Sequence, residues 1–259
     1  MTGVLPVALE NATKTVRVLL LAGKEYICVM RIHSEVSEEK VRKIMKEFIG
    51  EIYQRPPLVS SVRRRVRKRT IYYMNDIEFK NEYVLFRVGC QSGTYIRKLV
   101  FDIGEALGCG AHMAELRRTR VGPFTEDKCL VTLYDLSDAY SSWKEDGDES
   151  HLRKVVQPME NALTLIPQIY IRDSAVDAIC HGADLALPGI LRLESGIKPM
   201  DLVGIFSEKG EVVAIGKALM SSGEMVGLDH GLAVNTSRVI MPPGTYAPMW
   251  HRGSRSFRT

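Results

Sequence analysis

The chain has 259 residues, of which 45% are apolar and 25% are charged, and its net charge at pH 7 is +4. This length accommodates one large domain or two ordinary ones, and the composition is typical of soluble globular proteins. No apolar run approaches the roughly 20 residues that cross a membrane, and the start of the chain lacks the basic and apolar regions of a secretory signal. The five cysteines contain no C-x-x-C pair, so neither a zinc site nor a disulfide framework is predicted, and a reducing cytoplasm fits best.

Basic residues cluster in three places, although the net charge is modest. Six of the seven residues at 63–69, RRRVRKR, are basic. A second cluster consists of Arg117, Arg118 and Arg120, and the tail at 250–259 adds a third. A single basic run is most often a solvated surface or a flexible tail, and we expect the tail itself to be disordered. Three clusters beside ordered segments favour a polyanionic partner, for which nucleic acid is the commonest candidate.

The first part of the chain predicts a helix, a strand, a second helix and then a break. Residues 8–21 carry leucines and valines at helical spacing, and residues 26–32, YICVMRI, are typical of a strand. Ser37 is expected to cap the second helix, which a glycine ends. Two prolines follow Arg55, and the basic run 63–69 comes soon after them. We therefore expect a mobile arm at the mouth of a cleft, stiffened at its base by the prolines.

A strand-to-helix junction within residues 84–107 is the stretch around which this half of the chain is organised. An apolar strand pattern leads to Gly93, apolar residues at helical spacing follow, and Tyr95 and Arg97 stand at the junction. The start of a helix offers free N–H groups and a positive dipole end, which suit an anion. An aromatic ring and a guanidinium there could stack a base and hold a carboxylate or phosphate. An ordinary capped amphipathic helix is the alternative, and spacing alone favours it.

The segments on either side of this junction predict further elements. Residues 71–79 and 83–90 form an expected hairpin. Residues 108–124, GCGAHMAELRRTRVGPF, place glycines around a cysteine and then an amphipathic turn with arginines, which predicts a close approach of the backbone to a neighbour. Two later helices are expected, at 132–140 and at 149–165.

The character of the sequence changes after residue 166. Helical periodicity gives way to short apolar strands punctuated by glycine, which is typical of a small β-barrel-like module of roughly 80 residues. We therefore divide the chain into a first domain at 1–166 and a second at 167–249. The expected strands of the second domain are 202–207, 212–219, 231–234 and 238–241.

Several segments share their order and spacing with one known family: TGVLPVALENATK at 2–14, GKEYICVM at 23–30, QRPPLVSSV at 54–62, SGTYIRKL at 92–99 and GCGAHMAELRRTRVGPF at 108–124. They resemble the pseudouridine synthases of the TruB/dyskerin family. Two further segments, RTIYY at 69–73 and DSAVDAICHGADLALPGILR at 173–192, are similar to the archaeal and eukaryotic branch, whose members serve H/ACA guide-RNA particles. The resemblance extends to about Trp250.

The resemblance implies an α+β fold: a mixed-sheet catalytic domain, here short of its N-terminal strands, followed by a β-rich PUA pseudo-barrel. The implied activity is isomerisation of uridine to pseudouridine in tRNA, at the uridine of the TΨC loop, or in guide-RNA-directed rRNA, or in both. The base must leave its stack to be reached. No metal or organic cofactor is implied. The expected partners are tRNA, H/ACA guide RNA with rRNA, and the small proteins of the H/ACA particle, and the expected location is the cytoplasm.

The resemblance also assigns roles in the active site. Tyr95 matches the tyrosine that stacks on the target uracil and acts as a base late in the reaction, and Arg97 matches the arginine that pairs with the catalytic aspartate. Leu116 matches an apolar residue of the uracil pocket, and Tyr26 matches a tyrosine at the active-site entrance. On pattern alone, Tyr26 is more often a core residue, and Leu116 is expected to pack on a helix face. For Tyr95 and Arg97 to reach one pocket, the helix should begin near Arg97 rather than at Thr94.

Residues for RNA binding follow from the same comparison. Arg63, Arg64 and Arg65 match the loop that closes over substrate RNA, where their contribution should be electrostatic and salt-dependent. In the PUA domain, His181 and Arg192 match the RNA-facing segment. A histidine at a helix end is an equally good reading of His181.

The sequence departs from the family at the nucleophile. The catalytic aspartate of the family stands in a GTLDP-like motif a few residues before the block that matches Thr2–Pro6, and this sequence begins with Met1. Nothing marks Glu10, Asp102, Glu105 or Glu115 as a substitute. Two explanations are open: a start site upstream of Met1, which we favour, and a non-catalytic RNA-binding scaffold.

Overall fold

The computed structural model describes residues 2–56, 63–126 and 130–249. The basic tail at 250–259 and part of the QRPPLVSSV segment lie outside the described residues. The chain divides into two compact units: unit 1 comprises Met1–Val7 and Leu19–Gln157, and unit 2 comprises Ala8–Val18 and Pro158–Thr259.

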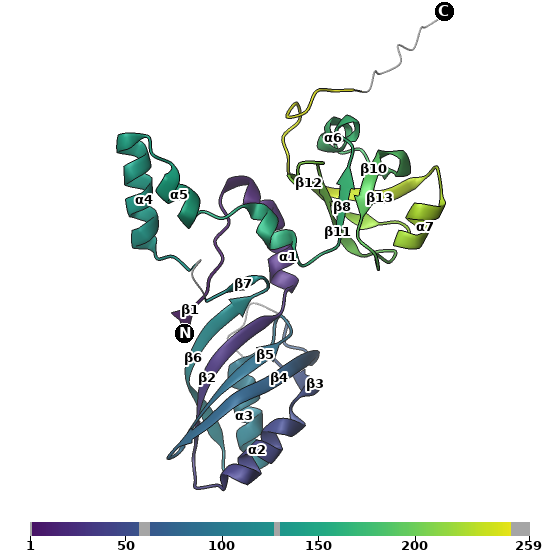
Figure 1. The fold of residues 1–259 in the computed structure, drawn as a ribbon. Helices are drawn as coiled ribbons and strands as arrows, with labels where there is room; N and C mark the ends of the chain where they lie inside the picture. The colour runs from purple at the N-terminus through teal and green to yellow at the C-terminus, as the bar shows by residue number, and fades with distance from the viewer. Residues whose placement is uncertain (1, 57–62, 127–129, 250–259) are drawn as a thin grey trace, which may run out of the picture. The chain divides into compact units, whose positions relative to one another are not determined.

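Unit 1 is built on a mixed sheet. Its described strands follow the order β1-β6-β2-β5-β4-β3, with β7 paired to β6 (Figure 1). The short β1 runs parallel to β6, whereas the other neighbours are antiparallel. The bounds are β1 (Thr2–Gly3), β2 (Lys24–Ile32), β3 (Gly50–Gln54), β4 (Arg67–Lys80), β5 (Tyr83–Cys90), β6 (Ala111–Val121) and β7 (Phe124–Thr125).

Two helices, α2 (Glu38–Glu47) and α3 (Ile96–Leu107), cover one face of this sheet and lie behind the strands in Figure 1. The alternation of β2 explains why. Cys28, Met30 and Ile32 point to the helix side and are buried, whereas the residues between them point the other way. Ser37 caps α2 as predicted, because its hydroxyl accepts a hydrogen bond from the N–H of Lys40. The core of unit 1 therefore lies between one face of the sheet and α2 and α3.

Several predicted elements of unit 1 differ from the observed ones. The predicted amphipathic turn after Gly108 is the long strand β6, which pairs with β2 and carries the adjacent Arg117 and Arg118 on opposite faces. The basic run 63–69 is not a free arm throughout, because β4 begins at Arg67 and pairs with β3. The predicted helix at 149–165 is interrupted, since Pro158 precedes a separate 3-10 turn. The helices here are α4 (Leu133–Asp146), α5 (Ser150–Val155) and η2 (Met159–Leu163).

Unit 2 contains a sheet whose described strands follow the order β10-β8-β11-β12-β13-β9. The predicted strands at 231–234 and 238–241 are one continuous strand, β13, paired with β12 through a register shift. The bounds are β8 (Gln168–Ile171), α6 (Asp173–Cys180), β9 (Leu185–Ala186), η3 (Leu187–Gly189), β10 (Ile190–Leu193), β11 (Leu202–Phe206), β12 (Val212–Ala218), α7 (Ser222–Gly227) and β13 (Leu232–Val239).

Most of the segment predicted as a helix at 8–21 belongs to unit 2, which takes Ala8–Val18. It forms η1 (Glu10–Thr15) and then α1 (Val16–Leu21). Val18 is buried in a cluster with Leu163 and Phe206, so both the early segment and η2 pack against the sheet of unit 2. The division between the units therefore follows Gln157 rather than residue 166. No helix in the described ranges has the length and apolar character that a membrane span requires.

Candidate active site at the start of helix α3

The junction between β5 and α3 has the geometry that the sequence analysis required. The helix begins at Ile96, and Tyr95 is its N-cap residue with an extended backbone, φ −97° and ψ 101°. Thr94, a residue type that caps helices well, does not cap this one, because its hydroxyl donates to the carbonyl of Gln91 at 2.7 Å. Tyr95 thus stands outside the helix, immediately before it.

A residue that the sequence analysis missed holds Tyr95 in place. The side chain of Gln54 accepts a hydrogen bond from the N–H of Tyr95 at 2.9 Å and donates one to the carbonyl of Tyr95 at 3.2 Å. Gln54 is only 2% exposed, at the end of β3. It lies within the matched segment QRPPLVSSV, but no pattern in the sequence points to a contact 41 residues away.

Arg97 is exposed on the first turn of α3. Within the described residues it forms no hydrogen bond or ion pair. The nearby Asp102 is already engaged by Lys98, one turn earlier on the same helix. The guanidinium of Arg97 is therefore available to an anion, whereas Asp102 is partly buried in its ion pair with Lys98.

Tyr26 and Leu116 lie on the helix-covered face of the sheet. Across β2 and β6, Tyr26 pairs with Arg118 and Cys28 pairs with Leu116, so the four side chains share the face of the buried Cys28. Leu116 is therefore on a strand, and the prediction that it packs from a helix face was wrong. Both Tyr26 and Leu116 are partly buried against the core.

Tyr26 also lies beside the turn that leads into α3. Burial raises the pKa of its hydroxyl, the neighbouring thiol of Cys90 adds to the rise, and the guanidinium of Arg118 opposes it. Cys90 is the last residue of β5, directly before the turn, and burial raises the pKa of its thiol to about 11. Tyr26 and the Tyr95–Arg97 junction thus belong to the same end of the sheet.

The basic run contributes two kinds of arginine. Arg63, Arg64 and Arg65 are exposed, as expected of a loop that contacts a polyanion. Arg67 and Arg69 are partly buried in β4, and the Nε atom of each is buried without a hydrogen-bond partner. A Cβ atom at Gly93 would lie 3.1 Å from Nη2 of Arg69, so this guanidinium sits against the turn before α3. Buried donors without acceptors are uncommon and mark a place where a ligand can be accommodated.

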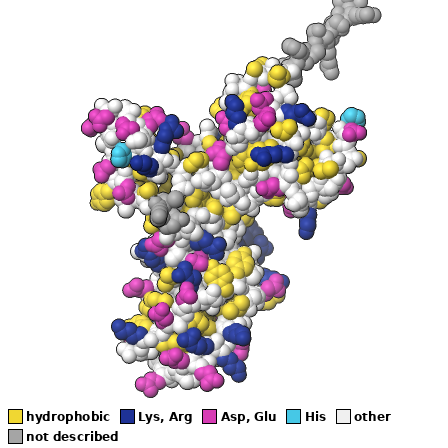
Figure 2. All heavy atoms as spheres, viewed as in Figure 1, with side chains coloured by type: hydrophobic (Ala, Val, Ile, Leu, Met, Phe, Trp, Pro, Cys, Tyr) yellow, Lys and Arg dark blue, Asp and Glu magenta, His cyan; other side chains and the backbone are white. Residues whose placement is uncertain are grey.

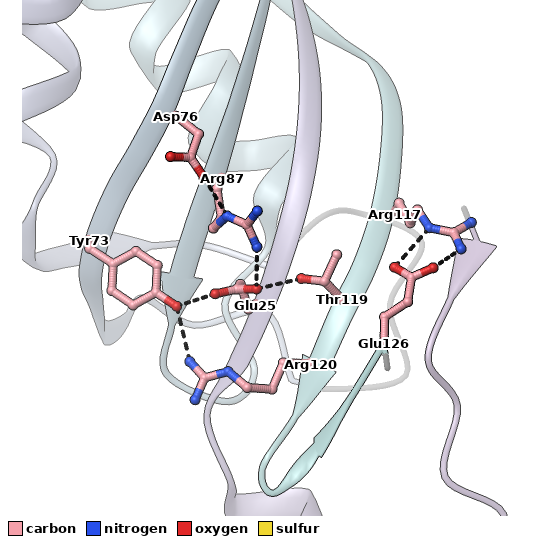
Figure 3. Close-up of polar contacts among 8 residues, drawn as sticks. All are labelled: Glu25, Tyr73, Asp76, Arg87, Arg117, Thr119, Arg120 and Glu126. Atoms are coloured by element: carbon pink, nitrogen blue, oxygen red, sulfur yellow. Dashed lines mark hydrogen bonds and ion pairs between the residues drawn. The ribbon is translucent and has the colours of Figure 1, made fainter. Parts of the chain in front are cut away.

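The opposite face of the sheet carries a polar network centred on Glu25 (Figure 3). The carboxylate of Glu25 accepts hydrogen bonds from Tyr73, from Thr119 at 2.7 Å and from Arg87 at 3.1 Å. Arg120 donates to the hydroxyl of Tyr73 at 3.0 Å. Burial alone would raise the pKa of the Glu25 carboxyl, but the hydrogen bonds from Tyr73, Thr119 and Arg87 outweigh it and hold the pKa below its ordinary value.

A glycine makes this network possible. A Cβ atom at Gly89 would lie 2.3 Å from Cζ of Tyr73, so the ring of Tyr73 crosses β5 over Gly89 to reach Glu25. Arg87 also binds Asp76 at 2.6 Å. Over the sheet of unit 1, basic and acidic side chains intermingle rather than segregate (Figure 2). The ion pairs of Arg87 with Glu25 and Asp76 neutralise charge within the network.

In unit 2, the two predicted RNA-contacting residues are both engaged within the unit. The guanidinium of Arg192 stacks 3.7 Å from the ring centroid of Tyr170. Nδ1 of His181 lies 2.8 Å from the carbonyl oxygen of Asp177, one turn back at the end of α6. The side chain of His181 remains about half exposed.

In the described ranges, no group of three or more His, Cys, Asp or Glu side chains could hold a metal ion.

Three family models of RNA-modifying and RNA-binding proteins match consecutive parts of the chain, in agreement with a mixed-sheet domain followed by a β-rich unit. Residues 1–96 match the TruB family pseudouridylate synthase N-terminal domain, residues 97–164 the tRNA pseudouridylate synthase B C-terminal domain, and residues 167–240 the PUA domain.

Similar curated proteins and solved structures agree with these models. A probable tRNA pseudouridine synthase B of Methanopyrus kandleri is 60% identical over 249 residues, which span 96% of this chain and 73% of that protein. Another from Thermococcus gammatolerans is 57% identical over 96% of this chain and 75% of that protein. The chain belongs to the TruB family of pseudouridine synthases.

Two solved structures match nearly all of this chain. A Cbf5-Nop10-Gar1 complex matches with a TM-score of 0.88 and 57% identity, over 93% of this chain and 73% of that chain. An H/ACA RNP bound to a substrate RNA containing 2'-deoxyuridine matches with a TM-score of 0.89 and 53% identity, over 96% of this chain and 75% of that chain. These matches confirm the predicted fold of a mixed-sheet synthase domain followed by a PUA domain.

Proposed function

We propose that this protein isomerises uridine to pseudouridine in RNA, with tRNA, guide-RNA-directed rRNA, or both as substrates. Its similarity to probable tRNA pseudouridine synthases and to a chain in an H/ACA RNP with substrate RNA supports both substrate classes. The same similarities favour an enzyme over a non-catalytic RNA-binding scaffold. Cytoplasmic location stays a prediction.

The observation that carries this proposal is the junction before α3. Tyr95 is extended and held outside the helix, Arg97 is exposed and available to an anion, and Tyr26 lies at the same end of the sheet. In the proposed site, Tyr95 stacks on the extruded uracil and accepts a proton late in the reaction, and Arg97 orients the nucleophilic carboxylate. Leu116 lines the uracil pocket, and Tyr26 packs at its entrance.

The nucleophile itself is a separate part of the proposal. No GTLDP-like motif occurs in the printed sequence. In-frame translation of the genomic sequence upstream of Met1 shows whether such a motif is encoded there.

RNA binding is proposed for both units. Arg63, Arg64 and Arg65 contact the RNA backbone electrostatically, and His181 and Arg192 are the proposed contacts of the PUA domain. Because one matched structure is a complex with Nop10 and Gar1 and another is an H/ACA RNP, we propose that small particle proteins and guide RNA are partners of this chain as well.

A tritium-release assay tests the activity. Isomerisation breaks the bond from N1 of uracil to the ribose and forms one from C5, so a tritium atom at C5 is lost to water while N1 gains a proton. The assay is run on uridine-labelled tRNA with the printed chain and with an upstream-extended form that carries the GTLDP-like motif. Release of tritium by either form supports the proposed activity. Tight RNA binding without release by either form would instead support the scaffold.

A further inference from the structure

We infer that Gln54 is a positioning residue of the active site, whose buried side chain fixes the backbone of Tyr95 and so sets the direction of the Tyr95 ring. This inference rests on the proposed function, since Tyr95 is the proposed stacking residue and base. A buried carboxamide must find partners for its donor and its acceptor. Gln54 finds both in one residue, the N–H and the carbonyl of Tyr95.

The two hydrogen bonds decide where α3 begins. Without them, Thr94 would be the expected cap, because threonine is favoured there and the helical pattern starts immediately afterwards. Tyr95 would then be the first residue inside the helix. Each residue of a helix turns the side chain by about 100°, so the ring would point elsewhere. Gln54 instead holds Tyr95 extended, and the carbonyl of Tyr95 still accepts the first helical hydrogen bond, from Leu99 at 3.0 Å.

Gln54 also lies beside the start of β4, directly after the segment that carries Arg63, Arg64 and Arg65. Gln54 is the last residue of β3 and pairs in register with Arg67, the first residue of β4. The chain between these two residues carries Arg63, Arg64 and Arg65, so both of its ends are fixed at the Gln54–Arg67 pair. A single side chain therefore links the proposed RNA-contacting segment to the proposed base-stacking residue.

The decisive variant is Gln54→Glu, because its effect should depend on pH. A protonated carboxyl can accept from the N–H and donate to the carbonyl of Tyr95, as the amide does, whereas a carboxylate can only accept and would repel the carbonyl. In the upstream-extended form, we expect kcat to fall about 10- to 100-fold, with a much smaller change in KM, at a pH where the introduced carboxyl is ionised, and the deficit to shrink as the pH is lowered. Because burial raises the pKa of a carboxyl, the profile is followed from about pH 5 to about pH 9. The wild-type enzyme serves as the reference at each pH.

Gln91→Glu is the matched control. Gln91 lies at the start of the turn that leads into α3, and its side chain accepts one hydrogen bond, from the N–H of Thr70 at 3.2 Å. A glutamate retains that acceptor at any pH, so this variant should not acquire activity that is rescued by acid. A deficit of the same pH shape in both variants would indicate a general structural effect and would overturn the inference.

Amide hydrogen exchange provides a readout that does not need catalysis. In the 259-residue protein, the substitution Gln54→Ala should accelerate hydrogen exchange at the N–H of Tyr95 and leave exchange in the middle of α3, at Ile103, unchanged. If the wild-type extended form shows no isomerisation, the proposed function fails, and exchange alone decides the positioning role. Unchanged exchange at Tyr95, or activity of Gln54→Glu that equals the wild type at every pH up to about 9, would overturn it.

Discussion

Polar groups on the open face of the unit 1 sheet bind one another, whereas several polar groups near the start of α3 have no partner among the described residues. On the open face, Glu25, Tyr73 and Arg87 satisfy one another (Figure 3). At the start of α3, Arg97 has no partner among the described residues, and the Nε atoms of Arg67 and Arg69 are buried without acceptors. Polar groups that satisfy one another stabilise a fold, whereas polar groups left without partners are tolerated where a ligand completes them.

This contrast predicts opposite consequences for substitutions on the two sides. Changes at the start of α3 should reduce turnover and leave stability nearly intact. Changes in the Glu25 network should reduce stability and leave the turnover of each folded molecule intact.

The largest expected effect is at Tyr95. Tyr95→Phe retains the ring for stacking and removes the hydroxyl that we propose to act as a base. We expect the rate of isomerisation to fall by about 100-fold or more, with RNA affinity little changed, because general bases typically contribute that much. Single-turnover kinetics and equilibrium RNA binding of the upstream-extended form measure the two quantities. A wild-type rate for Tyr95→Phe would exclude the proposed role of the hydroxyl.

The second prediction concerns stability on the open face. Glu25→Ala removes the shared acceptor of Tyr73, Thr119 and Arg87, and should lower the free energy of unfolding by about 2–3 kcal/mol. Urea unfolding measures the change. Glu51→Ala, which breaks an exposed ion pair with Lys68, is the control and should have a far smaller effect. Equal losses for the two variants would show that the network adds nothing beyond a surface pair.

The third prediction follows from the lowered pKa of Glu25. The carboxyl ionises more readily in the folded state than in the unfolded state, where its ordinary value is 4.5. Its contribution to stability is therefore fully present above about pH 5 and is lost as the pH falls through the folded-state pKa. We expect the unfolding free energy of Glu25→Gln to depend less steeply on pH below 4.5 than that of the wild type. Parallel curves would contradict the lowered pKa.

The smallest expected effect is on RNA affinity. Replacing Arg63, Arg64 and Arg65 together by glutamine should weaken binding to tRNA and flatten its dependence on salt by about 2 in the log–log slope. Affinities measured across a range of salt concentrations give the slope. The control replaces three exposed lysines elsewhere in unit 1, Lys43, Lys46 and Lys80. An unchanged slope in the arginine variant would contradict the proposed contact.

Much of this architecture could be predicted from local patterns. The cap at Ser37, the hairpin of β4 and β5 and the helix that follows Tyr95 were predictable because each depends on residues close together in the sequence. The fold of both units followed from the matched motifs, and the start of α3 satisfied the geometric condition set for Tyr95 and Arg97.

The features that the sequence did not predict share a physical cause: each depends on a partner that is distant in the sequence. Residues 111–121 form a strand because β2 and β1 are available to pair with them, although arginines and small residues make their pattern ambiguous. Val18 joins unit 2 because Leu163 and Phe206 bury it. The role of Gln54 could not be predicted for the same reason, because its partner Tyr95 is distant in the sequence.

The most direct test compares two arginines of the same domain in the upstream-extended form. Arg97→Met removes an available cation, and Arg87→Met removes one that binds both Asp76 and Glu25. Turnover per folded molecule and the free energy of unfolding are measured for both. We expect Arg97→Met to lose about 100-fold or more in turnover with stability within about 0.5 kcal/mol of wild type. Arg87→Met should lose about 1–2 kcal/mol of stability and keep its turnover. Wild-type turnover in Arg97→Met, or loss of turnover in a fully stable Arg87→Met, would contradict the account.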